Sequence, residues 1–224
     1  MQLHEQYRPK AFKDVVGQSR AIKKITTLER RGLAGRSYWI EGKSGTGKTT
    51  IGNLIADTVA DDFTTFNIDS STCTMKTIQD ICRKFSFRTL TANGYAVVVN
   101  ESHGLRKDVI RHLLDVLEDV PDNVVWVFTT TCDGHDSLFG DDHIDAHPLL
   151  SRCQVIGLQK NVRTAFAKRA KEIAEKEGLG GKGLVAYEQL AAREKDNLRS
   201  MLQHIEAGDM LSDDGDEDVM AMFS

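Results

Sequence analysis

The stretch GKSGTGKT, residues 42–49, contains the residue types needed to hold a triphosphate. It fits the pattern G-x-x-x-x-G-K-T, in which glycines let backbone N–H groups curl around phosphate oxygens. We expect Lys48 to bridge the β- and γ-phosphates and the Thr49 hydroxyl to bind Mg²⁺. The expected cofactors are thus ATP and Mg²⁺, and the expected binding residues are Gly42, Lys43, Ser44, Gly45, Thr46, Gly47, Lys48, Thr49 and Thr50.

A second chemical candidate follows the apolar run YAVVV, where the chain continues with Asn100 and Glu101. A glutamate at such a strand end can polarise the water that attacks ATP, so Glu101 is the expected catalytic carboxylate. Asn100 stands where an aspartate is usual, and it keeps an oxygen but lacks the charge. Because Mg²⁺ retains most of its waters, Asn100 can still hold the ion through water. We expect slowed hydrolysis; an ATP-binding scaffold is the alternative.

The elements that must position these residues follow from the apolar pattern. Short apolar runs predict strands at residues 37–42, 63–69, 95–100, 123–131 and 153–158. Helical periods between them predict helices near residues 19–32, 49–59, 75–85 and 106–117. Strands that alternate with helices predict an α/β fold with a parallel sheet flanked by helices, and the phosphate loop falls between a strand and a helix as it must.

Composition sets the domain organisation. The chain has 224 residues, enough for one large core and a small satellite domain. We expect an α/β core over residues 1–158, a small all-α lid domain over 159–209 and an acidic, disordered tail over 210–224. The first residues are polar and no apolar run approaches membrane-spanning length, so a cytoplasmic location without membrane contact is expected, or the host cytoplasm if the protein is viral. A net charge of −4 excludes a globally basic surface.

With these motifs, the chain resembles the AAA+ clamp-loader ATPases, namely the replication factor C small subunits and the bacterial gamma/tau subunit. The likeness runs in order over residues 7–208. The segment YRPKAFKDVVGQ resembles the family's entry segment, which wraps the adenine. The resemblance assigns that role to Tyr7, Arg8, Val15 and Val16.

Three further positions take roles from the same resemblance. The stretch from Glu101 to Thr131 resembles the family's segment that ends with a polar residue sensing the γ-phosphate. The resemblance assigns that role to Thr130 or Thr131. PLLSRC resembles the segment whose arginine reaches into the neighbouring subunit's ATP site, which implies Arg152 as a trans arginine finger. DNLRSML resembles the lid helix whose arginine contacts ATP, which implies Arg199.

The sequence also departs from the family. Only Cys73 and Cys82 lie where gamma/tau subunits have zinc-binding cysteines, so zinc is not expected and reduced thiols are. The residues after Asp209 are too few and too acidic to form the family's helical collar. We therefore expect assembly to depend on ATPase–ATPase contacts, on a companion protein or on DNA, with the copy number left open.

Clamp loaders imply sequence-independent binding of primer-template DNA, further loader subunits and a sliding clamp as partners. Binding of DNA phosphates by basic side chains would be salt-dependent. The alternative is that the same basic residues only keep exposed helix faces solvated. The DNA candidates are Lys76, Arg83, Lys84, Arg106, Lys107 and Arg111.

Two segments keep open alternatives. The acidic run at 213–218 precedes Val219, Met220, Met222 and Phe223, and it either docks into a partner or only increases solubility. His135, His143 and His147 lie among aspartates, where a polar loop is favoured over a metal site.

The sequence as a whole predicts an ATP-dependent clamp-loader-like subunit acting on DNA in replication. A nucleotide-gated oligomeric adaptor, or a helper protein that forms filaments on DNA with little ATPase activity, is the alternative.

Overall fold

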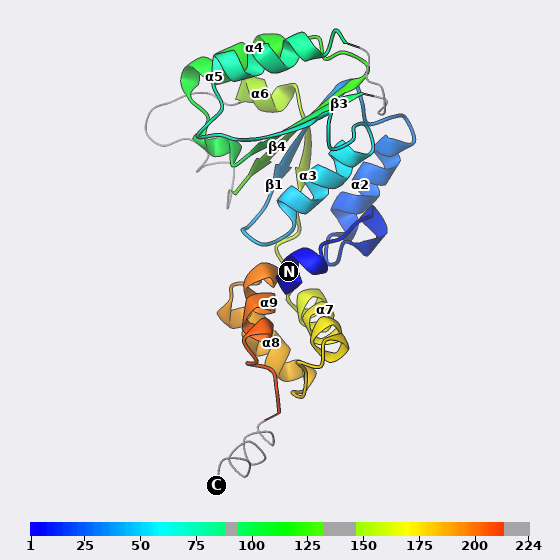
Figure 1. The fold of residues 1–224 in the computed structure, drawn as a ribbon, viewed down its shortest axis with the longest axis vertical. Coiled ribbons are helices and arrows are strands. Elements are labelled where there is room, and N and C mark those ends of the chain that lie inside the picture. Colours follow the sequence, from blue (N-terminus) through cyan, green and yellow to red (C-terminus); the bar gives the residue numbers. More distant parts are fainter. Residues whose placement is uncertain (88–93, 132–146, 213–224) are drawn as a thin grey trace. The chain divides into compact units, whose positions relative to one another are not determined.

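The computed structural model describes residues 1–87, 94–131 and 147–212. These residues group into two compact units (Figure 1). The sheet unit consists of Lys10–Val15 and Ser19–Lys160, and the helical unit consists of Met1–Pro9, Val16–Gln18 and the chain from Asn161 on. The expected tail over 213–224 lies outside the described residues.

The sheet unit is built on a five-stranded sheet in the order β2-β3-β4-β1-β5. All of its described strand pairs are parallel. The strands are β1 (Arg36–Glu41), β2 (Thr65–Asp69), β3 (Tyr95–Asn100), β4 (Val124–Thr130) and β5 (Gln154–Gly157). Because the strands are parallel, the segments that follow β1, β3 and β4 emerge at one edge of the sheet, which is the edge where ligands bind in open α/β folds.

Helices cover both faces of this sheet (Figure 1). On one face lie α4 (Met75–Lys84), α5 (Lys107–Val116) and the short α6 (His147–Ser151); on the other lie α2 (Ser19–Glu29) and α3 (Lys48–Asp57). Two 3₁₀ turns, Phe12–Asp14 and Ser102–Gly104, complete the unit. The predicted parallel sheet with flanking helices is confirmed.

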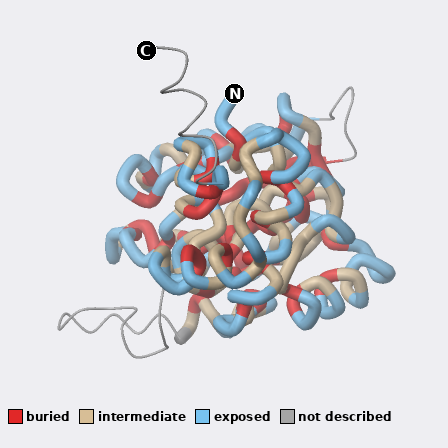
Figure 2. The backbone as a smooth tube through the Cα atoms, turned by 90° about the horizontal axis from the view of Figure 1, so that it is seen from below, coloured by how far each residue is buried: buried red, intermediate tan, exposed pale blue. Residues whose placement is uncertain are grey.

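Alternation along the strands supplies both layers of the core. On β3, Val97 and Val99 pack with α4 and α5, whereas Ala96 and Val98 pack with α2 and α3. All four are fully buried, as expected for a central parallel strand covered on both faces. The surrounding helices alternate between buried and exposed residues along their length (Figure 2).

The helical unit contains α1 (Leu3–Gln6), α7 (Arg163–Lys176), α8 (Leu184–Arg193) and α9 (Leu198–Glu206). Its core includes Phe166, Tyr187 and Met201, and the N-terminal Leu3 is buried among them. The grouping of Met1–Pro9 therefore differs from the expected core of residues 1–158, because the apolar side chain of Leu3 packs with this helical cluster. No helix in the described segments is long and apolar enough to cross a membrane.

Candidate nucleotide-binding site

The phosphate loop connects β1 to α3 and contains two residues with left-handed backbone. Gly45 has φ of 72° and Gly47 has φ of 100°. An L side chain is disfavoured at such angles, so glycine is required for the loop to turn back on itself. Gly47 is also the residue that precedes α3, so the N-terminus of this helix, with its positive dipole end, adjoins the loop.

Lys48 lies folded over this loop. Its ammonium donates a hydrogen bond to the backbone carbonyl of Lys43 at 2.9 Å, and the Thr46 hydroxyl donates to the same carbonyl at 2.7 Å. The Lys48 residue is only 6% exposed. A cation at the mouth of a curled backbone, next to a helix N-terminus, is an arrangement suited to a phosphate chain.

Small residues allow the loop and its helix to approach the sheet. A Cβ on Gly42 would lie 2.9 Å from Leu158 Cβ, and one on Gly52 would lie 3.2 Å from Val127 Cγ1. Glycine at these positions therefore seats the loop and α3 close to the sheet. Thr49 and Thr50 are half-buried in the first turn of α3, and their contacts with phosphate and Mg²⁺ stay predictions.

Asn100 ends β3 and is oriented by the neighbouring strand. Its amide oxygen accepts a hydrogen bond of 3.2 Å from the hydroxyl of Thr129, which is 1% exposed on β4. Sequence reasoning missed Thr129, because only the pairing of β3 with β4 brings the two residues together. Asn100 is thus held in place as a neutral oxygen at the sheet edge.

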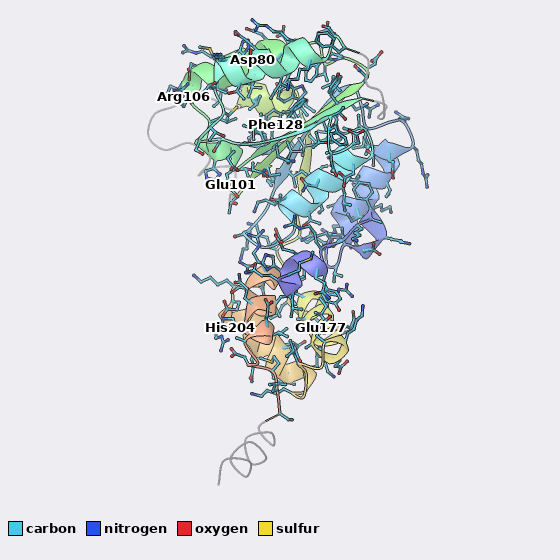
Figure 3. The ribbon with its side chains drawn as sticks, in the orientation of Figure 1. Asp80, Glu101, Arg106, Phe128, Glu177 and His204 are labelled. Carbon is cyan, nitrogen blue, oxygen red and sulfur yellow. The ribbon has the colours of Figure 1, made fainter. Side chains whose placement is uncertain are left out.

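Glu101, labelled in Figure 3, follows directly and has an unusual backbone conformation. Its φ of 50° and ψ of 47° place a non-glycine residue in the left-handed region, a conformation that stores strain at functional sites. Both carboxylate oxygens accept from the Thr131 hydroxyl, at 3.1 and 2.9 Å. His103 Nδ1 lies 3.5 Å from one of the same oxygens. The carboxylate is therefore fixed by two side chains and remains half exposed.

The two threonines considered for phosphate sensing lie in different surroundings. Thr130 is fully buried, and its hydroxyl lies 3.4 Å from His103 Nδ1. Thr131 is less buried and contacts Glu101. The role of Thr130 at the γ-phosphate stays a prediction. His103 was not anticipated, although an ionisable residue two positions beyond Glu101 was a visible signal.

The residues expected to hold Mg²⁺ fit the ion by ligand type. Thr49 offers a hydroxyl and Asn100 an amide oxygen, and oxygen ligands are those that Mg²⁺ prefers. Neither carries charge, and the orientation of Asn100 by Thr129 leaves its oxygen with one lone pair for water. The chain thus supplies a neutral oxygen set, and phosphate and water oxygens would complete the coordination.

Arg152 follows α6 in the sheet unit. Its Nη1 donates to the backbone carbonyl of Pro148 at 3.1 Å, and its Nη2 donates to the carboxylate of Glu118. Sequence reasoning did not foresee Glu118, which lies 34 positions away. The reach of Arg152 into a neighbouring copy stays a prediction.

Three of the four adenine candidates and the lid arginine belong to the helical unit, while Val15 belongs to the sheet unit. The Tyr7 hydroxyl donates to Glu177, and this hydrogen bond raises the pKa of Tyr7. Arg169 and Lys176 lie over its ring. Arg199 is exposed near the start of α9. The contacts of Tyr7, Arg8, Val15, Val16 and Arg199 with a nucleotide stay predictions.

The DNA candidates divide into two groups on α4 and α5, and all of them are exposed. Lys76 lies in the first turn of α4, and Arg106, Lys107 and Arg111 lie at or near the start of α5. Arg83 and Lys84 end α4, where Arg83 pairs with Asp80 at 3.1 Å. Because both helices run back along a parallel sheet, their N-termini lie at its carboxyl edge and their C-termini at the opposite edge. Only the first group shares an edge with the phosphate loop.

The described cysteines were also compared with what thiol or metal chemistry requires. Burial raises the pKa of the Cys153 thiol to about 11 and also raises the pKa of Cys73 and Cys82, so none is activated as a nucleophile. Within the described ranges, no group of three or more His, Cys, Asp and Glu side chains is arranged to hold a metal ion. His135, His143 and the side chain of His147 lie outside what the structure describes.

Comparison with known proteins decides the family resemblance. The chain is 22% identical over 200 residues to DNA polymerase III subunit tau of Bacillus subtilis, a match covering 79% of this chain and 34% of that protein. It is 26% identical over 199 residues to subunit gamma/tau of Mycoplasma genitalium, covering 78% of this chain and 32% of that protein. The predicted resemblance to AAA+ clamp-loader ATPases is confirmed. The match to this chain spans only 34% of the Bacillus subtilis protein and 32% of the Mycoplasma genitalium protein. No protein-family model matches the chain.

Among solved structures, the clamp-loader relative is similar to the RuvB Holliday junction branch migration motor of Thermotoga maritima. The TM-score is 0.66 at 20% sequence identity, and the match covers 89% of this chain and 64% of that chain. At this identity the likeness shows a shared fold and nothing more.

Proposed function

We propose that this clamp-loader relative is an ATP-dependent AAA+ subunit that acts on DNA during replication in the cytoplasm. The observation that carries the proposal is the shared sheet edge. There, the curled loop with the buried Lys48 and the fixed carboxylate of Glu101 follow strands of one parallel sheet. The 22% sequence identity over 200 residues to DNA polymerase III subunit tau of Bacillus subtilis supports the same assignment.

In this proposal each residue has a defined task. The loop N–H groups and Lys48 bind the phosphates, while Thr49 and Asn100 hold Mg²⁺, which when bound neutralises charge on the phosphate oxygens. Glu101, oriented by Thr131, polarises the attacking water and takes up its proton. Arg152 of a neighbouring copy stabilises the charge that develops on the γ-phosphate.

The neutral Asn100 makes a specific prediction about rate. Asn100→Asp restores a negative charge beside the Mg²⁺ waters. We therefore expect half-maximal activity at a lower Mg²⁺ concentration and a rise in turnover of roughly 10-fold, within the range of a single electrostatic contact. Steady-state phosphate release titrated with MgCl₂ measures both. Thr129→Val is the companion variant, because it removes the hydroxyl that orients Asn100 without changing charge. Unchanged Mg²⁺ dependence in both variants would remove Asn100 from the metal site.

DNA binding is proposed at the edge shared by Lys76, Lys107 and Arg111. Lys107→Ala with Arg111→Ala should reduce the slope of log affinity against log salt by about 2, since each lost phosphate contact removes roughly one released counterion. Fluorescence anisotropy of a primer-template duplex from low to moderate salt measures this slope.

Arg83→Ala with Lys84→Ala is the matched control, because it removes the same charge at the opposite edge. Equal slopes for both double variants, or affinity that does not fall with salt in the parent protein, would contradict the proposed surface.

A second candidate function is favoured by Asn100 itself. A neutral residue in place of the usual aspartate suits a nucleotide-gated oligomeric adaptor, or a filament-forming helper, in which bound ATP holds the assembly and turnover is slow. Phosphate release with and without primed DNA separates the two functions. The loader function predicts stimulation by DNA, and the adaptor function predicts slow release that DNA does not change. A companion loader subunit and a sliding clamp are the further partners implied by the loader function.

A further inference from the structure

The guanidinium of Arg152 is held on its own protomer by acceptors from two separate elements. Nη1 donates to Pro148 O in α6, and Nη2 donates to Glu118, which lies two residues beyond the end of α5. The Arg152 side chain is 28% exposed and the Glu118 side chain is 63% exposed. The pair therefore lies at the surface, with the arginine largely enclosed.

The third guanidinium nitrogen faces inward. Arg152 Nε is buried and has no hydrogen-bond partner among the residues that the structure describes. A guanidinium carries one N–H on Nε and two on each terminal nitrogen. The bonds to Pro148 and Glu118 thus leave one N–H on each terminal nitrogen as a donor for phosphate oxygens.

We propose that Glu118 is a positioning residue for the trans arginine. Its carboxylate holds Arg152 in the orientation in which the guanidinium meets the triphosphate of a neighbouring copy. The inference rests on the proposed trans role of Arg152 and adds a residue that neither the sequence motifs nor the comparisons assign.

The physical reason is preorganisation. A long arginine side chain samples many rotamers, and ordering it only when phosphate arrives weakens the transition-state contact. A hydrogen-bonded ion pair in a partly exposed place is weak in water, so Glu118 orients the guanidinium without outcompeting a triphosphate, which carries several negative charges. The backbone carbonyl of Pro148 alone constrains only one nitrogen and leaves rotation about that bond.

Substitution of Glu118 gives the first test. In Glu118→Ala, ATP hydrolysis by the full chain should fall on the order of 10- to 100-fold with the ATP Kd unchanged, as expected when a catalytic group is misplaced rather than removed. Glu118→Gln keeps an acceptor oxygen and should recover most of the rate. Asp119→Ala is the matched control, because it removes the adjacent exposed charge and should leave the rate unchanged.

Recovery of hydrolysis in mixed assemblies of two variants separates a positioning role of Glu118 from a general effect on folding. Glu101→Gln protein keeps its Arg152 and serves as arginine donor, whereas Arg152→Ala protein keeps its own pocket and serves as acceptor. A mixture of the two should regain hydrolysis. A donor carrying Glu101→Gln and Glu118→Ala together should fail to restore it, while Glu118→Ala protein as acceptor should respond fully to a Glu101→Gln donor.

Each outcome bears on a separate claim. Loss of activity in Arg152→Ala with an unchanged or raised rate in Glu118→Ala overturns the positioning role and leaves the trans arginine standing. Failure of Glu118→Ala protein both as donor and as acceptor also overturns it, since the defect would then be structural. Wild-type hydrolysis in Arg152→Ala removes the trans arginine and the role of Glu118 with it.

Discussion

Arg152→Ala should lower ATP hydrolysis by about 10³-fold, which corresponds to about 4 kcal/mol of lost transition-state stabilisation. Positive charge positioned at the γ-phosphate acts mainly as the terminal bond breaks, so ATP affinity should change little while turnover falls. Steady-state phosphate release and equilibrium binding of a fluorescent ATP analogue separate these two quantities.

The trans character of Arg152 needs a concentration test. If the arginine comes from a neighbouring copy, the specific activity of the parent protein rises with protein concentration as copies associate, and the Arg152→Ala activity stays low throughout. Arg163→Ala is a suitable control, because Arg163 forms an ion pair with Asp196 inside the helical unit and has no proposed role at the nucleotide. A loss in Arg152→Ala that matches the loss in Arg163→Ala would point to general destabilisation instead.

Glu101→Gln should reduce hydrolysis by about 10²- to 10⁴-fold, because an amide cannot accept the proton of the attacking water. The isosteric amide retains an oxygen for the Thr131 hydroxyl, so the fold and ATP binding should persist. Single-turnover phosphate release with saturating ATP measures the chemical step directly.

The control for Glu101→Gln is a substitution of Thr131, whose hydroxyl donates to the Glu101 carboxylate. Thr131→Val leaves the carboxylate in place but removes one of the two side chains that fix it, so a smaller fall than in Glu101→Gln is expected. A Glu101→Gln protein that hydrolyses ATP at the parent rate would show that this carboxylate does not activate water, and would favour the adaptor function.

Local patterns were sufficient for the fold class and the phosphate loop. β3 occupies the same residues, 95–100, that the apolar run predicted, because a strand buried on both faces needs an uninterrupted apolar sequence. The loop was predictable because glycine spacing, Lys48 and Thr49 act within a few residues of one another and need no distant partner. The first-turn placement of Thr49 in α3 follows from the same local signal.

Side-chain orientation depended instead on contacts that are distant in sequence. Asn100 and Thr129 meet through the β3–β4 pairing, Glu101 meets Thr131 across 30 positions, and Arg152 meets Glu118 across 34. Motif spacing carries no record of such partners, because it constrains the backbone near each residue and not the neighbouring strand or helix.

The sequence by itself determined which groups are available for chemistry, namely a phosphate loop, a carboxylate at a strand end, a neutral Asn100 and a motif arginine. Only the tertiary structure decided which residues orient them, that Leu3 packs with the helical unit, and that the basic residues of α4 and α5 divide between two edges of the sheet. The reason is physical. Residue type and local spacing set intrinsic chemistry and backbone propensity, whereas burial and strand register set which distant side chains come within hydrogen-bonding distance.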